Sequence, residues 1–282
     1  MPKGRQTGTP RRRCKAPTNG SPRLRRPAFW LCDAVGRLSG VAETEWRTQL
    51  RAAVYRGDGH AVIRLARPDR KRNTTALQLI GDGLIRALTA QIQDAAEIAA
   101  DCVAALAERD WPGDTELGQQ LQALLGTGPT PLLRPLPVDL AELTDILEGD
   151  PTHGGGLLDL HTGQVWPQAT IDYAHDNPGE MPGAPEEDDD PDRWLPVHGE
   201  GSHDSYHDME LFIDTLADLH QADRLQIAIH GRGAFRRFKD ILGRTPDELD
   251  RWFAFSEERQ RGRARTWLAD AGYKPLTTPT TT

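Results

Sequence analysis

Two histidines one helical turn apart, His203 and His207, come closest to a catalytic motif. At this spacing in zinc-dependent hydrolases, two His bind the metal and an adjacent Glu activates the bound water. Here the acid is Asp204, and the Gly-containing stretch 199–202 suggests that His203 precedes a helix whose N-cap is Asp204. The sequence therefore predicts surface histidines at a helix start and no metal site.

Three glycine-rich segments invite comparison with phosphate-binding loops: 57–59, 154–156 and 231–233. None has the Lys and Ser or Thr of a P-loop, and none follows a strand in a strand-helix-strand unit, so we expect turns. No nucleophile-elbow sequence singles out a Ser. We therefore predict no catalytic residue and no cofactor site, and we expect the chain not to be an enzyme.

The most informative segment runs from Gly231 to Leu242 and alternates basic and aromatic residues. At 100° per residue, its apolar side chains share one helix face: Phe235, Phe238, Ile241 and Leu242. Three cations, which we call the basic ridge, border that face: Arg232, Arg236 and Lys239. The ridge either binds an anion or nucleic acid, or pairs with acids of neighbouring helices. We favour pairing, with candidates Glu210, Asp214, Glu248 and Glu257.

Charge is unevenly distributed along the 282 residues, whose formal net charge is −8. Residues 1–27 hold nine basic side chains and no acid, so the remainder, with 25 basic and 42 acidic side chains, carries −17. Basic Pro-rich sequence buries too little apolar surface to offset ordering entropy, so we expect a disordered arm. We favour a solvated tail, for example an upstream extension from a misplaced start codon; the alternative is an electrostatic tether to nucleic acid or to the acidic body.

Cysteine usage and hydropathy favour a cytoplasmic protein. Cys14, Cys32 and Cys102 form no CxxC pair, and no apolar stretch is long enough to span a bilayer. Arg25 and Arg26 resemble a twin-arginine export signal, but Asp33 ends the following apolar stretch too early. We expect no membrane association.

Apolar spacing divides the rest of the chain into two domains. Helical periodicity from 43 to 125 predicts a helical domain at 28–127, followed by a Pro-rich linker at 128–137. The second domain, 138–275, begins with a helix ending at Gly149 and continues with a hairpin around 157–166 and a third strand at 194–197. The tail is 276–282.

An acidic segment interrupts the second domain. Residues 172–192 hold nine acids, and we expect a disordered loop because such a run repels itself. Calcium is the alternative ligand, but consecutive acids at 186–190 lack EF-hand spacing. The C-terminal helices follow: Thr245-Pro246 begins one that ends near Phe255, and Ser256 caps the next, which ends at Gly272. Their aromatic residues are expected to be core.

Several of these motifs, in this order, resemble the bacterial Uncharacterised Protein Family 0158 over about residues 138–275. They are 138–140 (VDL), 158–165 (LDLHTGQV), 208–213 (DMELFI), 231–240 (GRGAFRRFKD), 252–255 (WFAF), and Trp267-Leu268 with the Ala-Gly-Tyr-x-Pro end. The helical region before them resembles the longer actinobacterial members. The resemblance implies no activity and no site residue, because the family has none established.

Together these observations predict an α+β, mostly helical protein, with a helical domain before a domain in which helices pack a small antiparallel sheet. We expect a non-enzymatic cytoplasmic module that binds another protein. One alternative is nucleic-acid binding through the arm and the basic ridge, which the acidic body opposes. The other is an enzyme whose ridge holds an anionic substrate, with His203, His207 or His230 as general base.

Overall fold

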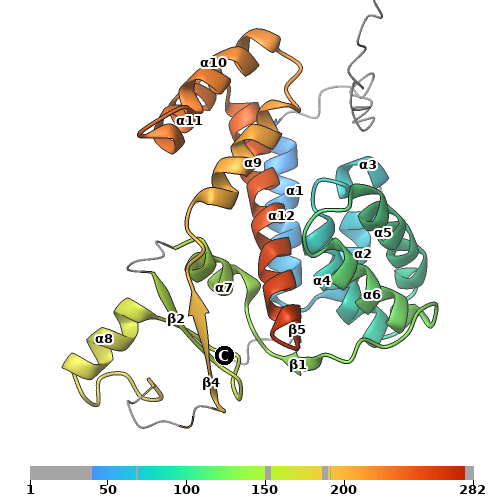
Figure 1. The fold of residues 1–282 in the computed structure, drawn as a ribbon. Helices are drawn as coiled ribbons and strands as arrows, with labels where there is room; N and C mark the ends of the chain where they lie inside the picture. The colour runs from blue at the N-terminus through green and yellow to red at the C-terminus, as the bar shows by residue number, and fades with distance from the viewer. Residues whose placement is uncertain (1–39, 68, 150–153, 186–189, 191, 277–282) are drawn as a thin grey trace, which may run out of the picture. The chain divides into compact units, whose positions relative to one another are not determined.

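The computed structural model describes residues 40–67, 69–149, 154–185, 190 and 192–276. Those residues belong to one compact unit, and the basic arm at 1–27 lies outside them. The first half of the described chain is helical, as the apolar period predicts (Figure 1). Its helices are α1 (Gly40–Tyr55), α2 (Gly59–Ala66), α3 (Arg70–Asn73), α4 (Leu77–Thr89), α5 (Ala95–Arg109) and α6 (Asp114–Leu125).

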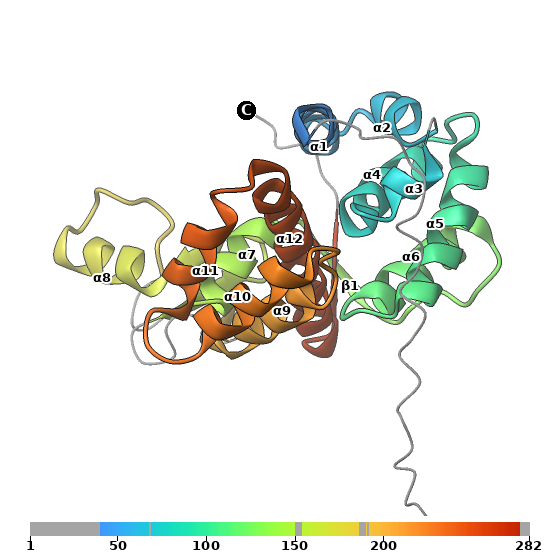
Figure 2. The same cartoon turned by 90° about the horizontal axis from the view of Figure 1, so that it is seen from above.

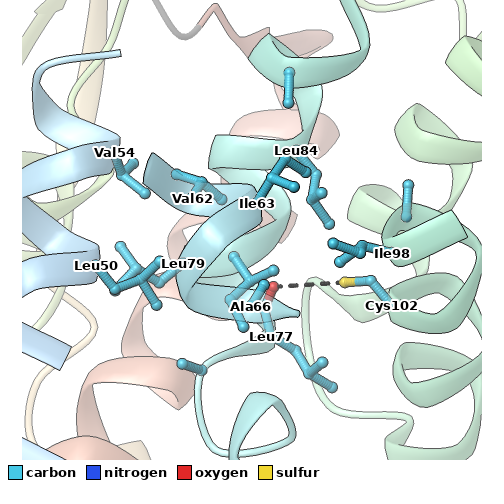
Figure 3. Close-up of a cluster of buried hydrophobic side chains, with 14 of the residues drawn as sticks. Leu50, Val54, Val62, Ile63, Ala66, Leu77, Leu79, Leu84, Ile98 and Cys102 are labelled. Carbon is cyan, nitrogen blue, oxygen red and sulfur yellow. Dashed lines mark hydrogen bonds between the residues drawn. The ribbon is translucent and has the colours of Figure 1, made fainter. Parts of the chain in front are cut away.

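These helices bury one apolar cluster of their own. Leu50 of α1, Val62 of α2 and Leu84 of α4 are fully buried in it. Figure 3 shows side chains from α1, α2, α4 and α5 converging there. At Gly83 of α4, an added Cβ would lie 2.6 Å from Val62, so the glycine allows α2 and α4 to pack closely.

The second half holds a three-stranded antiparallel sheet, as expected. Strands β2 (Gly155–Asp159) and β3 (Val165–Pro167) form the predicted hairpin, and β4 (Trp194–His198) pairs with the other edge of β2. Helix α7 (Leu140–Leu147), capped by the side chain of Asp139, packs against this sheet. The α+β, mostly helical fold class is confirmed.

Two connecting segments differ from the prediction. The segment 134–136, expected as linker, is strand β1 (Arg134–Leu136), which pairs in parallel with β5 (Tyr273–Pro275) and buries Leu136. The acidic segment expected to be open from residue 172 begins with α8 (Gln168–Asp176), because Ile171 and Ala174 give that helix a buried face. Residues 186–189 and 191 of this segment lie outside the described part of the chain.

The C-terminal helices are α9 (His203–Ile213), α10 (Leu219–Ile229), α11 (Ala234–Leu242) and α12 (Pro246–Asp270). The predicted break at Ser256 is wrong, since α12 continues through it. Glu257 and Glu258, which the prediction placed in the first turn of a new helix, instead pair with Arg47 and Arg109 of other helices. Asp204 is not the N-cap of α9: Ser202 holds that position, and Asp204 lies 3.8 Å from Arg263.

Helix α12 contacts the N-terminal helices (Figure 2), and the apolar cluster of residues 46–121 includes no α12 residue. The contact consists of buried polar groups and one edge-to-face ring pair, Phe255 with Trp111 at 5.1 Å between centroids. Asp82 of α4 accepts from Arg261 at 2.9 Å and from Arg265 at 2.5 Å. At the closest approach, a Cβ on Gly262 would lie 2.0 Å from the carbonyl oxygen of Pro112. On its other side, α12 donates to Asp208 of α9 through Arg259 and Arg263.

No helix in the described ranges is long and apolar enough to cross a membrane.

Candidate functional site

The three helices α9, α10 and α11 fold around an aromatic cluster with the start of α12. The ring of Phe212 lies 5.3 Å from Trp252, and Phe238 lies 4.8 Å from the same indole, both edge to face. Leu225 and Ile229 of α10 are fully buried in this cluster. The predicted apolar face of α11 is therefore inward, with Phe238 and Leu242 buried and Phe235 and Ile241 partly buried.

A four-residue turn, 230–233, connects α10 to α11. Gly231 and Gly233 have φ of 84° and 74°, in the left-handed region where a side chain would be strained. Arg237, on the α10 side of α11, donates to the carbonyl oxygens of Ala228 at 2.9 Å and His230 at 2.6 Å. These hydrogen bonds satisfy carbonyl groups at the C-terminal end of α10, and they therefore hold α11 against α10.

The basic ridge lies on the solvent side of this helix pair. Arg232, Arg236 and Lys239 are exposed. The side chain of Arg236 is 88% exposed, and the acid that it meets in the described ranges is Asp240 of its own helix, at 3.8 Å. The expected pairing with acids of neighbouring helices is wrong for three of the four candidates. Their partners are other residues: Glu210 contacts His207, Glu248 contacts Arg251, and Glu257 contacts Arg47 and Arg51.

The ridge belongs to a larger basic surface that the sequence did not single out. Segment 219–244 holds six basic side chains and two acids in a chain of net charge −8. All six are exposed, including Arg224 of α10 and Arg244 after α11. Two large apolar side chains of α10 accompany them, Leu219 at 75% and Ile227 at 74% exposure. We call these exposed side chains the α10–α11 surface.

Both apolar residues lie on the outer face of α10. At 100° per residue around the helix axis, Ile227 lies 80° from Leu219, and Asp223 lies between them. Arg224 lies 60° beyond Ile227. The buried residues of the helix, Leu225, Ala228 and Ile229, fall on the opposite side. Single exposed apolar residues are ordinary, but two on one helix face, with Asp223 between them and Arg224 beside them, are typical of a contact surface.

The three histidines of the enzyme hypothesis lie on two different parts of the C-terminal helices. His203 and His207 share α9, where His207 lies 3.3 Å from Glu210, and His230 follows α10 in the turn. Across the described ranges, no group of three or more His, Cys, Asp or Glu could hold a metal ion. The residues that the enzyme hypothesis requires are thus spread over the surface of two helices and a turn.

The two best-formed cavities in the described part of the chain include no ridge residue. One, of about 340 Å³, lies between α4 and α5 and is lined by Leu77, Ile98 and Cys102. Burial raises the pKa of the Cys102 thiol to about 12, so this thiol is a poor nucleophile. The other, of about 600 Å³, lies over α8 and is lined by His175, Met181 and Pro185.

Sequence reasoning also missed the buried charges around α12. Although burial opposes its ionisation, Arg265 and Arg261 lower the pKa of Asp82. Glu258, 1% exposed, accepts from the backbone N–H of Gln78 at 2.8 Å and from Arg109 at 3.0 Å. These pairs join positions 149 to 183 residues apart, so no local pattern signals them. They hold helices together and line no cavity.

The fold and this surface define an α+β protein with an open, basic helix pair and, in its described residues, no assembled catalytic set. Residues 157–279 match the model of the Uncharacterised protein family (UPF0158). The UPF0158 protein PA5073 of Pseudomonas aeruginosa is 27% identical over 150 residues, covering 51% of this chain and 88% of that protein. No solved structure matches. The matched family region includes the α10–α11 surface.

Proposed function

We propose that this chain is a non-enzymatic, cytoplasmic protein-binding module and that its partner contacts the α10–α11 surface. The observation that carries the proposal is the exposure of Leu219 and Ile227 on the same helix pair as cations that, in the described part of the chain, pair with no acid of another helix. Burying large apolar side chains drives most protein association, and charges around them select the partner. The unpaired cations favour a partner segment that is acidic.

The test compares affinity capture by the intact chain and by an Ile227→Asp variant, with quantitative mass spectrometry of the captured proteins. Leu132→Asp is the matched control, because Leu132 is another exposed aliphatic side chain, at 102%, and lies outside this surface. We expect at least one protein to be captured by the intact chain and the control and to be lost with Ile227→Asp. Identical capture by all three proteins would contradict the proposal.

Nucleic-acid binding is the second candidate, and the six exposed cations of segment 219–244 favour it. Phosphate contacts release counterions, so binding would weaken by orders of magnitude between low and physiological salt. A fluorescence-anisotropy titration with labelled DNA and RNA, using the full chain and a chain lacking residues 1–27, tests it. Binding lost with the arm would assign it to the arm, and binding lost in Arg236→Glu would assign it to the ridge.

A further inference from the structure

Helix α8 begins the most acidic segment of the chain and lies away from the basic surface. No Lys or Arg occurs from residue 168 to 192, and nine acids do. Within it, α8 packs on the sheet through Ile171 and Ala174 and presents Asp172 and Asp176 to solvent. Figure 1 shows α8 and the α10–α11 pair at opposite ends of the C-terminal part.

The acids of this helix and the turn after it have neutral partners. Asp172 accepts from the side-chain amide of Gln168 at 2.8 Å, and Glu180 accepts from the hydroxyl of Tyr173 at 2.7 Å. Among the residues that the structure places, no Lys or Arg pairs with Asp172, Asp176 or Glu180. Within the described ranges, no Lys or Arg therefore neutralises the negative charge of α8.

An aromatic side chain accompanies these acids. Tyr173 of α8 is 50% exposed, next to Asp172. Helix α8 thus combines an exposed ring with carboxylates, while the α10–α11 surface combines Leu219 and Ile227 with cations. The two surfaces are complementary both in charge and in having apolar side chains to bury together.

We propose that α8 of one copy of this chain docks on the α10–α11 surface of a second copy. This inference rests on the proposed function, since it names the partner of the same surface. Because both surfaces are present in every copy, a two-fold arrangement forms two such contacts in one closed dimer. Two contacts also help to reach the area of about 1,000 Å² or more that a specific interface needs.

The first measurement is sedimentation velocity of the full chain over a range of protein concentrations and salt. We expect a monomer–dimer equilibrium whose dissociation constant rises at least about tenfold as salt shortens the Debye length from about 10 Å at 0.1 M to about 3 Å at 1 M. A chain that is monomeric at every concentration and salt would overturn the inference. The capture experiment with Ile227→Asp would then still decide whether another protein uses the surface.

Charge reversal shows which surfaces meet. A ridge-reversed chain, Arg236→Glu with Lys239→Glu, and an α8-reversed chain, Asp172→Lys with Asp176→Lys, should each be monomeric, because like charges then face each other. Mixed together, the two variants should form a heterodimer in which both contacts are again complementary. All four positions are exposed, so folding should be unchanged, which circular dichroism checks.

The matched control is Arg56→Glu with Arg64→Glu, which makes the same change in net charge at two exposed cations of the N-terminal helices. It should dimerise as the unmodified chain does. If the control dissociates as the ridge-reversed chain does, net charge rather than the α10–α11 surface governs association, and the inference is wrong. It is equally wrong if the two reversed chains fail to associate on mixing while the unmodified chain dimerises.

Discussion

Glu258 of α12 should contribute more to stability than its neighbour Glu257. Its carboxylate accepts from the backbone N–H groups of Gln78 and Leu79 at 2.8 and 3.3 Å, at the start of α4, where Ala76 supplies no side-chain cap. It also accepts from Arg109 at 3.0 Å. One buried carboxylate on α12 therefore caps another helix and neutralises a buried cation.

The magnitude follows from burial. Removing one member of a buried ion pair costs about 3–5 kcal/mol, whereas an exposed pair contributes about 1 kcal/mol or less. Glu258 is 1% exposed, while the Glu257 side chain is 26% exposed where it meets Arg47 and Arg51. We expect Glu258→Ala to destabilise the chain by about 3–5 kcal/mol and Glu257→Ala by less, about 1–2 kcal/mol.

The assay is urea unfolding, monitored by circular dichroism at 222 nm and by tryptophan fluorescence. Glu258→Gln provides a second variant that keeps the shape and one acceptor but removes the charge, and it should fall between the intact chain and Glu258→Ala. Equal losses for Glu257→Ala and Glu258→Ala would refute the argument that burial and helix capping set the cost. Coinciding transitions from the two probes would justify a two-state treatment.

Three further outcomes follow from single positions. Although burial opposes ionisation, hydrogen bonds from Arg193 and from the amides of His161 and Thr162 hold the pKa of Asp159 at about 2. Its contribution to the free energy of unfolding should therefore be full above about pH 4 and should be lost as the pH falls through about 2. Asp159→Asn should flatten that part of the stability–pH curve. In thermal unfolding, Gly262→Ala should destabilise the chain by about 1–3 kcal/mol or more, because the added Cβ meets the backbone of Pro112. Gly118→Ala should stabilise it by about 0.5–1 kcal/mol, because its Cβ has open space around it and alanine favours the helix. Cys102 should react with a thiol reagent only on unfolding, since burial raises its pKa to about 12; rapid reaction in the native state would show that the cavity beside it admits the reagent.

Local sequence patterns predicted the elements that depend on local physics. The helix before Gly149, the hairpin around Thr162-Gly163 and the inward face of α11 follow from apolar spacing and turn chemistry. These signals involve residues within about one turn or one hairpin, so one segment is enough to read them. The exposure of the basic ridge depended instead on where distant acids lie.

The features that were missed depend on contacts between remote segments. The continuity of α12 through Ser256 reflects contacts of Glu257 and Glu258 with α1, α4 and α5, and the sequence around Ser256 alone resembles a helix start. Likewise, β1 exists because Arg134–Leu136 meets Tyr273–Pro275 from the far end of the chain. A single sequence contains no local trace of such pairs.

The central claim is that the α10–α11 surface contacts protein, and photo-crosslinking in living cells tests it most directly. A photoreactive amino acid at position 227 should give a protein adduct of defined mass, whereas the same group at position 55, where Tyr55 is 64% exposed on another helix, should not. Mass spectrometry of the adduct then identifies the partner, including a second copy joined through α8. No adduct at position 227, or an adduct sensitive to nuclease rather than to protease, would contradict the account.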